Sequence, residues 1–209
     1  MEEINKFTYI VDLPFKKLSE AETELFIELC RILRRSETNT CKIDFKALKS
    51  ITDQDILSTS LVKMNKKLVF ELSNDENTET MHIIPFSVCS INDDTVTLKC
   101  TENFMYFLKK DICLSAKDIK LIRKLSFKYS AKLYVNMLEH MRNHKWDIAL
   151  EDFRRLFNIP QSYKPAQIKE RIIDLAIKEL KEYNSGLECK VEYGNKENTM
   201  AISGYLFTM

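Results

Sequence analysis

Apolar residues recur at helical spacing in the segment SEAETELFIELCRILRR, residues 19–35. This spacing predicts an amphipathic helix, and its apolar stripe consists of Leu25, Phe26, Leu29, Ile32 and Leu33. Ser19, followed three residues later by Glu22, is typical of a capping box at a helix start. After the polar residues SETNT, the segment CKIDFKALKSI predicts a short extended piece and then a short helix that carries Phe45 and Leu48.

The same pattern returns in residues 126–159, SFKYSAKLYVNMLEHMRNHKWDIALEDFRRLFNI. At an offset of 108 residues, Leu25, Phe26, Leu29 and Leu33 are matched by Leu133, Tyr134, Met137 and Met141. After the polar break, at an offset of 105 residues, Ile43, Phe45, Leu48 and Ile51 are matched by Ile148, Leu150, Phe153 and Leu156. Two amphipathic segments can resemble each other by chance. A duplicated small domain is the preferred interpretation, because the match continues across the break.

A longer amphipathic segment runs from Lys164 to Tyr183. On a helical wheel its apolar residues span a sector of about 160°, and they are Ile168, Ile172, Ile173, Leu175, Ala176, Leu180 and Tyr183. The other side carries Lys164, Gln167, Arg171, Asp174, Lys178 and Lys181. Asn184-Ser185-Gly186 ends the helix, and LECKVEY and MAISGYLF predict two strands joined by the turn GNKENT. The order helix, strand, helix, helix, strand, turn, strand predicts a winged helix, a helix-turn-helix backed by a β-hairpin.

The first half continues in a similar way. TDQDILSTSLVKMNKKL predicts a third helix, LVFEL, MHIIPFSVCSI and TVTLKC predict strands, and ENFMYFLKK predicts a further short helix. The strand-rich residues 68–101 either close the core of this domain or form a dimer surface, and core is favoured for any single residue. With a junction between Asp111 and Lys120, we predict an α+β fold of two tandem winged-helix domains, residues 1–115 and 116–209.

Composition narrows the class of protein. Of the 209 residues, 44% are hydrophobic and 30% charged, which is typical of a globular protein. No run approaches the ~18 apolar residues of a membrane helix, and the acidic N-terminus is unlike a signal peptide. A cytoplasmic location is therefore predicted, without a membrane partner. The Lys- and Asn-rich composition indicates an AT-rich bacterial genome. The six cysteines are not spaced as a zinc site and are interpreted as reduced core residues.

Charge is distributed unequally along the chain. Residues 1–118 hold 16 Lys and Arg against 20 Asp and Glu, a net of −4, whereas the remaining 91 residues hold 16 against 11, a net of +5. A basic C-terminal half favours a polyanionic partner. The first half is acidic, so we do not expect both domains to bind DNA equally.

The third helix of a winged helix commonly lies in the DNA major groove. Arg171 and Lys164 are candidates for guanine contacts, and Gln167 for adenine. The candidates for phosphate contacts are Lys178, Lys181, Arg154, Arg155, Lys190, Asn195 and Lys196. The alternative is that these charges only solvate a helix face, since Lys178 has Asp174 and Glu182 at i,i+4 spacing.

Three stretches of the chain resemble the plasmid replication initiator proteins that bind iterons, the direct repeats of a plasmid origin. They are LPFKKLSEAETELFIEL in the first domain, and FKYSAKLYVNMLEH and WDIALEDFRRLFNIPQSYKPAQIKERIIDLAIKELKE in the second. The last one is the most specific, with Tyr-Lys, Lys-x-Arg and an alanine ahead of Lys-Glu. The resemblance covers roughly residues 7–207. It implies sequence-specific binding of double-stranded DNA, DNA contacts by Lys169 and Arg171, contacts with host replication proteins, and a homodimer formed through the first domain.

The sequence does not contain the motifs that several enzymatic activities require. Rolling-circle nicking requires a histidine pair separated by one apolar residue, but MHIIPF holds only His82. His140 and His144 stand four residues apart, but no third metal ligand is evident. No P-loop is present. We therefore predict a non-enzymatic protein without cofactor or metal. A tandem winged-helix transcription regulator and a winged-helix module that binds a partner protein remain as alternatives.

Overall fold

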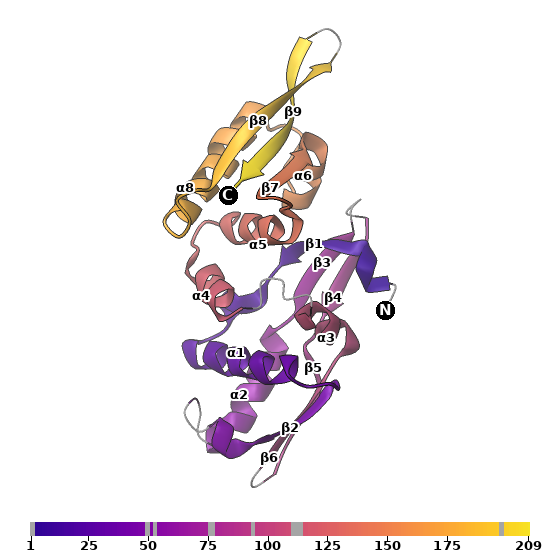
Figure 1. Ribbon diagram of the computed structural model, residues 1–209, viewed down its shortest axis with the longest axis vertical. Coiled ribbons are helices and arrows are strands. Elements are labelled where there is room, and N and C mark those ends of the chain that lie inside the picture. The colour runs from indigo at the N-terminus through magenta and orange to yellow at the C-terminus, as the bar shows by residue number, and fades with distance from the viewer. Residues whose placement is uncertain are drawn as a thin grey trace. The chain divides into compact units, whose positions relative to one another are not determined.

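The computed structural model of the chain describes residues 3–48, 51, 54–74, 78–92, 95–109, 115–196 and 199–209 (Figure 1). The first part contains η1 Glu3–Lys6, β1 Phe7–Asp12, η2 Pro14–Lys17, α1 Glu20–Arg34, β2 Thr40–Asp44, η3 Phe45–Ala47, α2 Gln54–Lys67, β3 Phe70–Asn74, β4 Thr80–Ile83, β5 Phe86–Ile91, β6 Thr95–Cys100, α3 Glu102–Lys109 and α4 Ala116–Lys124. The second part contains α5 Ser130–His140, β7 Lys145–Ala149, α6 Leu150–Phe157, α7 Pro165–Ile168, the π-helical turn η4 Lys169–Ile173, α8 Asp174–Lys181, β8 Glu188–Lys196 and β9 Thr199–Thr208. None of the helices in these ranges combines the length and apolar character needed to cross a bilayer.

The chain forms two compact units, neither of which is continuous in sequence. Unit 1 comprises residues 1–4, 12–71 and 81–124, and unit 2 comprises residues 5–11, 72–80 and 125–209. Most of strand β1 therefore belongs with the C-terminal residues, which the periodicity of the sequence does not reveal. The predicted division into residues 1–115 and 116–209 stays a prediction.

Unit 2 carries the predicted winged helix. Its sheet has the order β7-β9-β8 with antiparallel neighbours, and its helices α5, α6 and α7–α8 precede the hairpin in the predicted order. Strand β9 pairs with β7 only from Gly204 to Thr208, whereas its pairing with β8 continues outward to Thr199. The hairpin therefore extends beyond the three-stranded part of the sheet, as Figure 1 shows.

Unit 1 repeats this topology. Its sheet β2-β6-β5 has the same antiparallel order, and α1, η3 and α2 take the places of α5, α6 and α7–α8. The predicted strand MHIIPFSVCSI is divided into β4 and β5 at Pro85, a residue that lacks the amide proton a sheet ladder requires. The chain also forms a separate sheet, β1-β3-β4, whose residues are not confined to unit 1.

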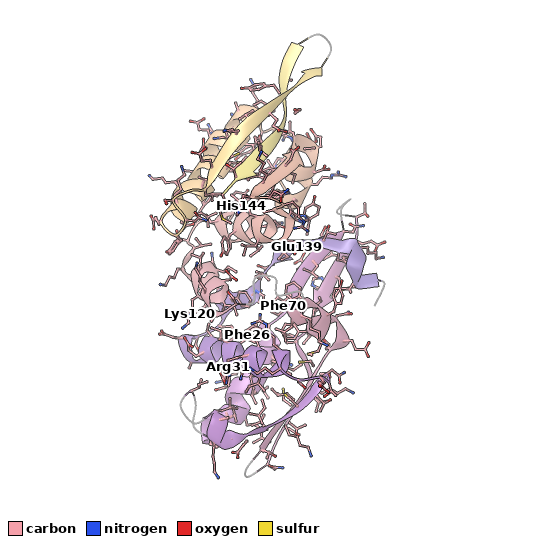
Figure 2. All side chains as sticks on the ribbon, in the orientation of Figure 1. Phe26, Arg31, Phe70, Lys120, Glu139 and His144 are labelled. Atoms are coloured by element: carbon pink, nitrogen blue, oxygen red, sulfur yellow. The ribbon has the colours of Figure 1, made fainter. Side chains whose placement is uncertain are left out.

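An aromatic cluster fills the core of unit 1. Phe70 contacts Phe26, Phe104 and Phe107 with ring centroids 5.6–6.3 Å apart, and Phe15 packs at 5.7 Å from Phe70 (Figure 2). Phe15, Phe26, Phe70 and Phe104 are fully buried. Aromatic side chains bury large areas at such separations, so this cluster holds α1, α3 and β3 together.

The predicted capping box at the start of α1 is confirmed. The amide of Glu22 donates to Ser19 Oγ at 3.2 Å, and the amide of Ser19 donates to Glu22 Oε2 at 2.7 Å. The same carboxylate accepts from Lys67 Nζ at 2.6 and 2.7 Å and is buried. Burial alone would raise the pKa of Glu22, but the bonds from Lys67 and Ser19 outweigh it and hold this pKa below its ordinary value.

A buried amide attaches the N-terminal strand to unit 2. Asn136 in α5 accepts from the amide of Ile10 at 3.0 Å and donates to the carbonyl of Ile10 at 2.8 Å. Its side chain also donates to the carbonyl of Lys132. The Asn136 residue is fully buried, so it satisfies backbone groups that water cannot reach.

Replacing Asn136 with Ala should lower the free energy of unfolding by roughly 2–4 kcal/mol, because the amide and carbonyl of Ile10 would lose these partners in a buried position. Urea denaturation measures this change. Gln161→Ala, which removes an exposed amide from the same unit, should change stability by less than about 0.5 kcal/mol. Equal effects of the two substitutions would contradict the assigned role.

The lowered pKa of Glu22 predicts a loss of stability in acid. Because the folded-state pKa lies below the unfolded value, the contribution of Glu22 is present above the unfolded pKa of about 4.3 and is lost as the pH falls through the folded-state pKa. Denaturation midpoints between pH 7 and pH 3 should therefore fall more steeply for the native protein than for Glu22→Gln. Parallel pH profiles would show that the ion pair with Lys67 makes no contribution.

Candidate nucleic-acid interface

One helix, built from α7, the π turn η4 and α8, carries most of the predicted contacts. Lys164 precedes it in extended conformation, and Pro165 occupies its first position, where the missing amide proton is not needed. The carbonyl of Pro165 accepts a hydrogen bond of 2.9 Å from the hydroxyl of Tyr205 in β9. The start of the helix is therefore attached to the central strand of the sheet, and we call this helix the recognition helix.

The π turn changes which residues of the recognition helix face the core. The amide of Asp174 donates to the carbonyl of Lys169, five residues back, so this turn holds one more residue than an α turn. Ile168, Ile172, Ile173, Ala176 and Leu180 are buried as predicted, but Ile177 is buried as well. The inward positions predicted for Leu175 and Tyr183 are wrong, since these side chains are 48% and 45% exposed.

Four cations on the outward side of this helix are available to a ligand. Lys164, Arg171, Lys178 and Lys181 are exposed. None of them has an ion pair with another side chain among the described residues. The pairing of Lys178 with Asp174 or Glu182, which the spacing allowed, is therefore not formed within that part of the chain. Unpaired cations on one helix face are suited to phosphate and guanine acceptors.

Two predicted contact residues instead make bonds within the helix. Lys169 is bound to the carboxylate of Asp174, one π turn away, and its side chain is only 23% exposed. Gln167 accepts from the amide of Lys164 at 2.9 Å through Oε1, which satisfies one of the free amides at the helix start. Lys169 therefore neutralises an acid beside the free cations, and Gln167 keeps only its NH₂ group for adenine.

The expectation that Arg154 contacts phosphate is corrected by its burial. Arg154 is 5% exposed, and its guanidinium donates to the carbonyl of Pro160 at 3.0 Å and to that of Tyr163 at 2.5 Å. These carbonyls lie in the turn between α6 and the recognition helix. That turn begins at Asn158, which ends α6 in left-handed conformation. Arg154 therefore fixes the turn of the helix-turn-helix from inside.

The remaining candidates differ in their surroundings. Arg155 is exposed on α6 and bound to Asp152, a surface pair that a phosphate can replace. Lys190 projects, with Glu188 and Glu192, from the side of β8 opposite Cys189 and Val191. A hydrogen bond with Asp147 raises the pKa of Glu192 on this outer sheet face, so Lys190 has an acidic neighbourhood that favours phosphate poorly. The side chains of Asn195 and Lys196 lie outside the described residues.

The two histidines considered as metal ligands do not share a helix. Helix α5 ends at His140, whose ring stacks on Trp146 with centroids 5.7 Å apart. His144 lies in the tight turn before β7, where Asn143 and His144 have φ angles of 50° and 61° (Figure 2). The described residues contain no group of three or more potential ligands.

Arg154→Ala should lower the free energy of unfolding by roughly 2–4 kcal/mol, since two carbonyls of the buried turn lose a charged donor. Arg155→Ala is the matched control, because it removes the same charge from the next position, where the side chain is exposed. It should change stability by less than about 0.5 kcal/mol. Thermal or urea denaturation of both variants measures this difference. Equal stability of the two variants would contradict the internal role of Arg154 and favour the predicted phosphate contact.

Comparison with known proteins agrees with this geometry. The model of the family described as "Initiator Rep protein, WH2" matches residues 149–209. No curated protein gives a significant match. The solved structure of the Pi initiator protein in complex with iteron DNA is similar at a TM-score of 0.50 and 17% identity, covering 98% of each chain. A structure of domains 2 and 3 of RctB is similar at a TM-score of 0.40 and 10% identity, covering 90% of this chain and 80% of that one.

The first of these structures shows that the tandem winged-helix fold is shared over nearly the whole chain. The family match contains α6, the recognition helix, β8 and β9. It also contains most of the segment that carried the specific part of the sequence resemblance, from Ala149 onward. Residues 149–209 therefore match the model of the second winged-helix domain of initiator Rep proteins.

Proposed function

We propose that this chain is a non-enzymatic replication initiator that binds the direct repeats of a plasmid origin as double-stranded DNA. The observation that carries the proposal is the recognition helix in an initiator-type winged-helix domain, with Lys164, Arg171 and Lys178 exposed and without ion-pair partners among the described residues. A helix of this width enters the major groove, where guanine presents two acceptors to an arginine.

The shape of unit 2 supports the same function. Beyond Gly204, the β8–β9 hairpin extends past β7 to the pair Lys196 and Thr199. A projecting hairpin beside a recognition helix gives a second contact with the DNA backbone or the minor groove. The Pi initiator, which shares the fold, was solved with iteron DNA, and this agrees with a DNA ligand here.

The two alternative functions predict different ligands or different DNA sites. A tandem winged-helix transcription regulator would use the same helix on a different DNA site, and only the number and arrangement of bound repeats separates it from an initiator. If the chain instead binds a partner protein, the unpaired cations of the recognition helix would not contact nucleic acid. The homodimer through the N-terminal domain and the contacts with host replication proteins stay predictions. Strand β5, with Val88 48% exposed, is one of the two edge strands of the sheet β2-β6-β5 at which a dimer would be sought.

Binding to a labelled duplex that carries the repeats beside the gene, compared with a scrambled duplex, tests the function. The specific duplex should bind ~10³-fold or more tightly, and log affinity should fall linearly with log salt. Occupation of several adjacent repeats favours the initiator over the regulator. Equal, weak binding to both duplexes would exclude sequence recognition and favour a protein partner.

Arg171→Ala should weaken binding to the specific duplex about 10- to 100-fold and reduce its preference over the scramble, because a bidentate contact to a base is lost. Lys145→Ala removes one positive charge from β7 in the same unit, where the side chain is exposed, and should leave this preference unchanged. Fluorescence anisotropy at fixed salt measures both variants. A uniform loss on the two duplexes in Arg171→Ala would assign Arg171 to phosphate instead.

A further inference from the structure

One apolar side chain of the recognition helix is exposed in the middle of its cationic face. Leu175 is 48% exposed. The other large aliphatic residues of the helix are at most 7% exposed, and they are Ile168, Ile172, Ile173, Ile177 and Leu180. A single exposed leucine on a protein surface needs no explanation. In this helix, however, its exposure has an identifiable structural cause.

The cause is the π turn. Ile168 and Ile172 are buried four residues apart, and continuation of this α-helical stripe would place Leu175, three residues after Ile172, on the inner side. The extra residue in the turn Lys169–Ile173 shifts the phase, so that Ile177 becomes buried and Leu175 turns outward. Helical irregularities of this kind are frequent at functional sites.

The surroundings of Leu175 are those of a base-reading position. Arg171 precedes it by four residues and Lys178 follows it by three, so all three share one face of the helix. The adjacent acid, Asp174, is bound to Lys169. The leucine is therefore flanked by two cations that lack ion-pair partners among the described residues, and its nearest acid is neutralised.

We propose that Leu175 is a specificity-determining residue that contacts the C5-methyl group of a thymine in the major groove. This inference rests on the proposed function. Thymine alone among the four bases presents a methyl group in that groove, and apolar side chains read it. Four residues of helix rise about 6 Å and base pairs are stacked about 3.4 Å apart. The thymine therefore lies about two base pairs from the base that Arg171 contacts.

Replacing each thymine of the repeat, one at a time, with deoxyuridine removes the methyl group and leaves base pairing intact. The native protein should bind the duplex with one such replacement about 3- to 5-fold more weakly, since one buried methyl group is lost. Replacement at the other thymines should change affinity less than 2-fold. The sensitive thymine should lie about two base pairs from the position at which Arg171→Ala relaxes specificity.

Leu175→Ala should bind the all-thymine duplex about as weakly as the native protein binds the sensitive deoxyuridine duplex, and should no longer distinguish the two. Tyr183→Ala is the control, because Tyr183 is also a large exposed side chain but follows the C-terminal end of α8. It should keep the full 3- to 5-fold discrimination. Circular dichroism and the thermal midpoint confirm that both variants are folded.

The outcomes separate the two levels of the proposal. Native protein that prefers the repeat over a scramble but binds every deoxyuridine duplex normally would overturn the leucine contact and leave the function intact. Retained discrimination in Leu175→Ala would overturn it as well. Absence of any preference over the scramble would overturn the proposed function and the leucine contact with it.

Discussion

The hydrogen bond from Tyr205 to the carbonyl of Pro165 joins the central strand of the unit 2 sheet to the start of the recognition helix. Tyr205 is fully buried in β9, and its hydroxyl is 2.9 Å from the start of the recognition helix. Burial raises the pKa of Tyr205 to about 12, so the phenol stays protonated and keeps donating. Next to it, a Cβ atom at Gly204 would lie 2.7 Å from the carbonyl of Ile148, and only glycine permits β7 to approach so closely. One strand therefore positions helix, wing and β7 together.

Arg171 and Lys178 lack ion-pair partners among the described residues because neighbouring acids of the recognition helix are bound to other groups. Asp174 is the acid best placed to pair with Lys178 along an α helix, but the π turn brings it to Lys169 instead. Glu179 accepts from the amide and hydroxyl of Ser126 at 2.5 and 2.6 Å. Burial alone would raise the pKa of Glu179, but these bonds outweigh it and keep the pKa low. Both acids are thus bound elsewhere, and Arg171 and Lys178 remain open to a ligand.

Much of the fold follows from local pattern. The capping box at Ser19, the duplicated helix-strand-helix order and the C-terminal hairpin were all predictable because periodicity and turn chemistry act over a few residues. The attachment of β1 to α5 through Asn136 was not predictable, since it joins residues 126 positions apart. The π turn was not predictable either, because the helical wheel assumes one uniform period. The assumption of uniform α-helical winding therefore placed Leu175 on the inner side. Residue type alone placed Arg154 on the surface, whereas its side chain is buried against the turn that follows α6.

A formal net charge of +1 is small for the DNA-binding protein that we propose, and the pairing of the acids in unit 2 bears on this. Several acids of unit 2 are directed away from the recognition helix or neutralised: Glu192 interacts with Asp147 on the outer sheet face, and Asp174 is paired with Lys169. The recognition helix therefore keeps exposed cations, among them Arg171 and Lys178, in a chain whose total charge is close to zero. If the proposed complex with DNA has few phosphate contacts, the salt-dependent part of its affinity is small. Contacts to base edges, which distinguish one sequence from another, would then supply a larger share.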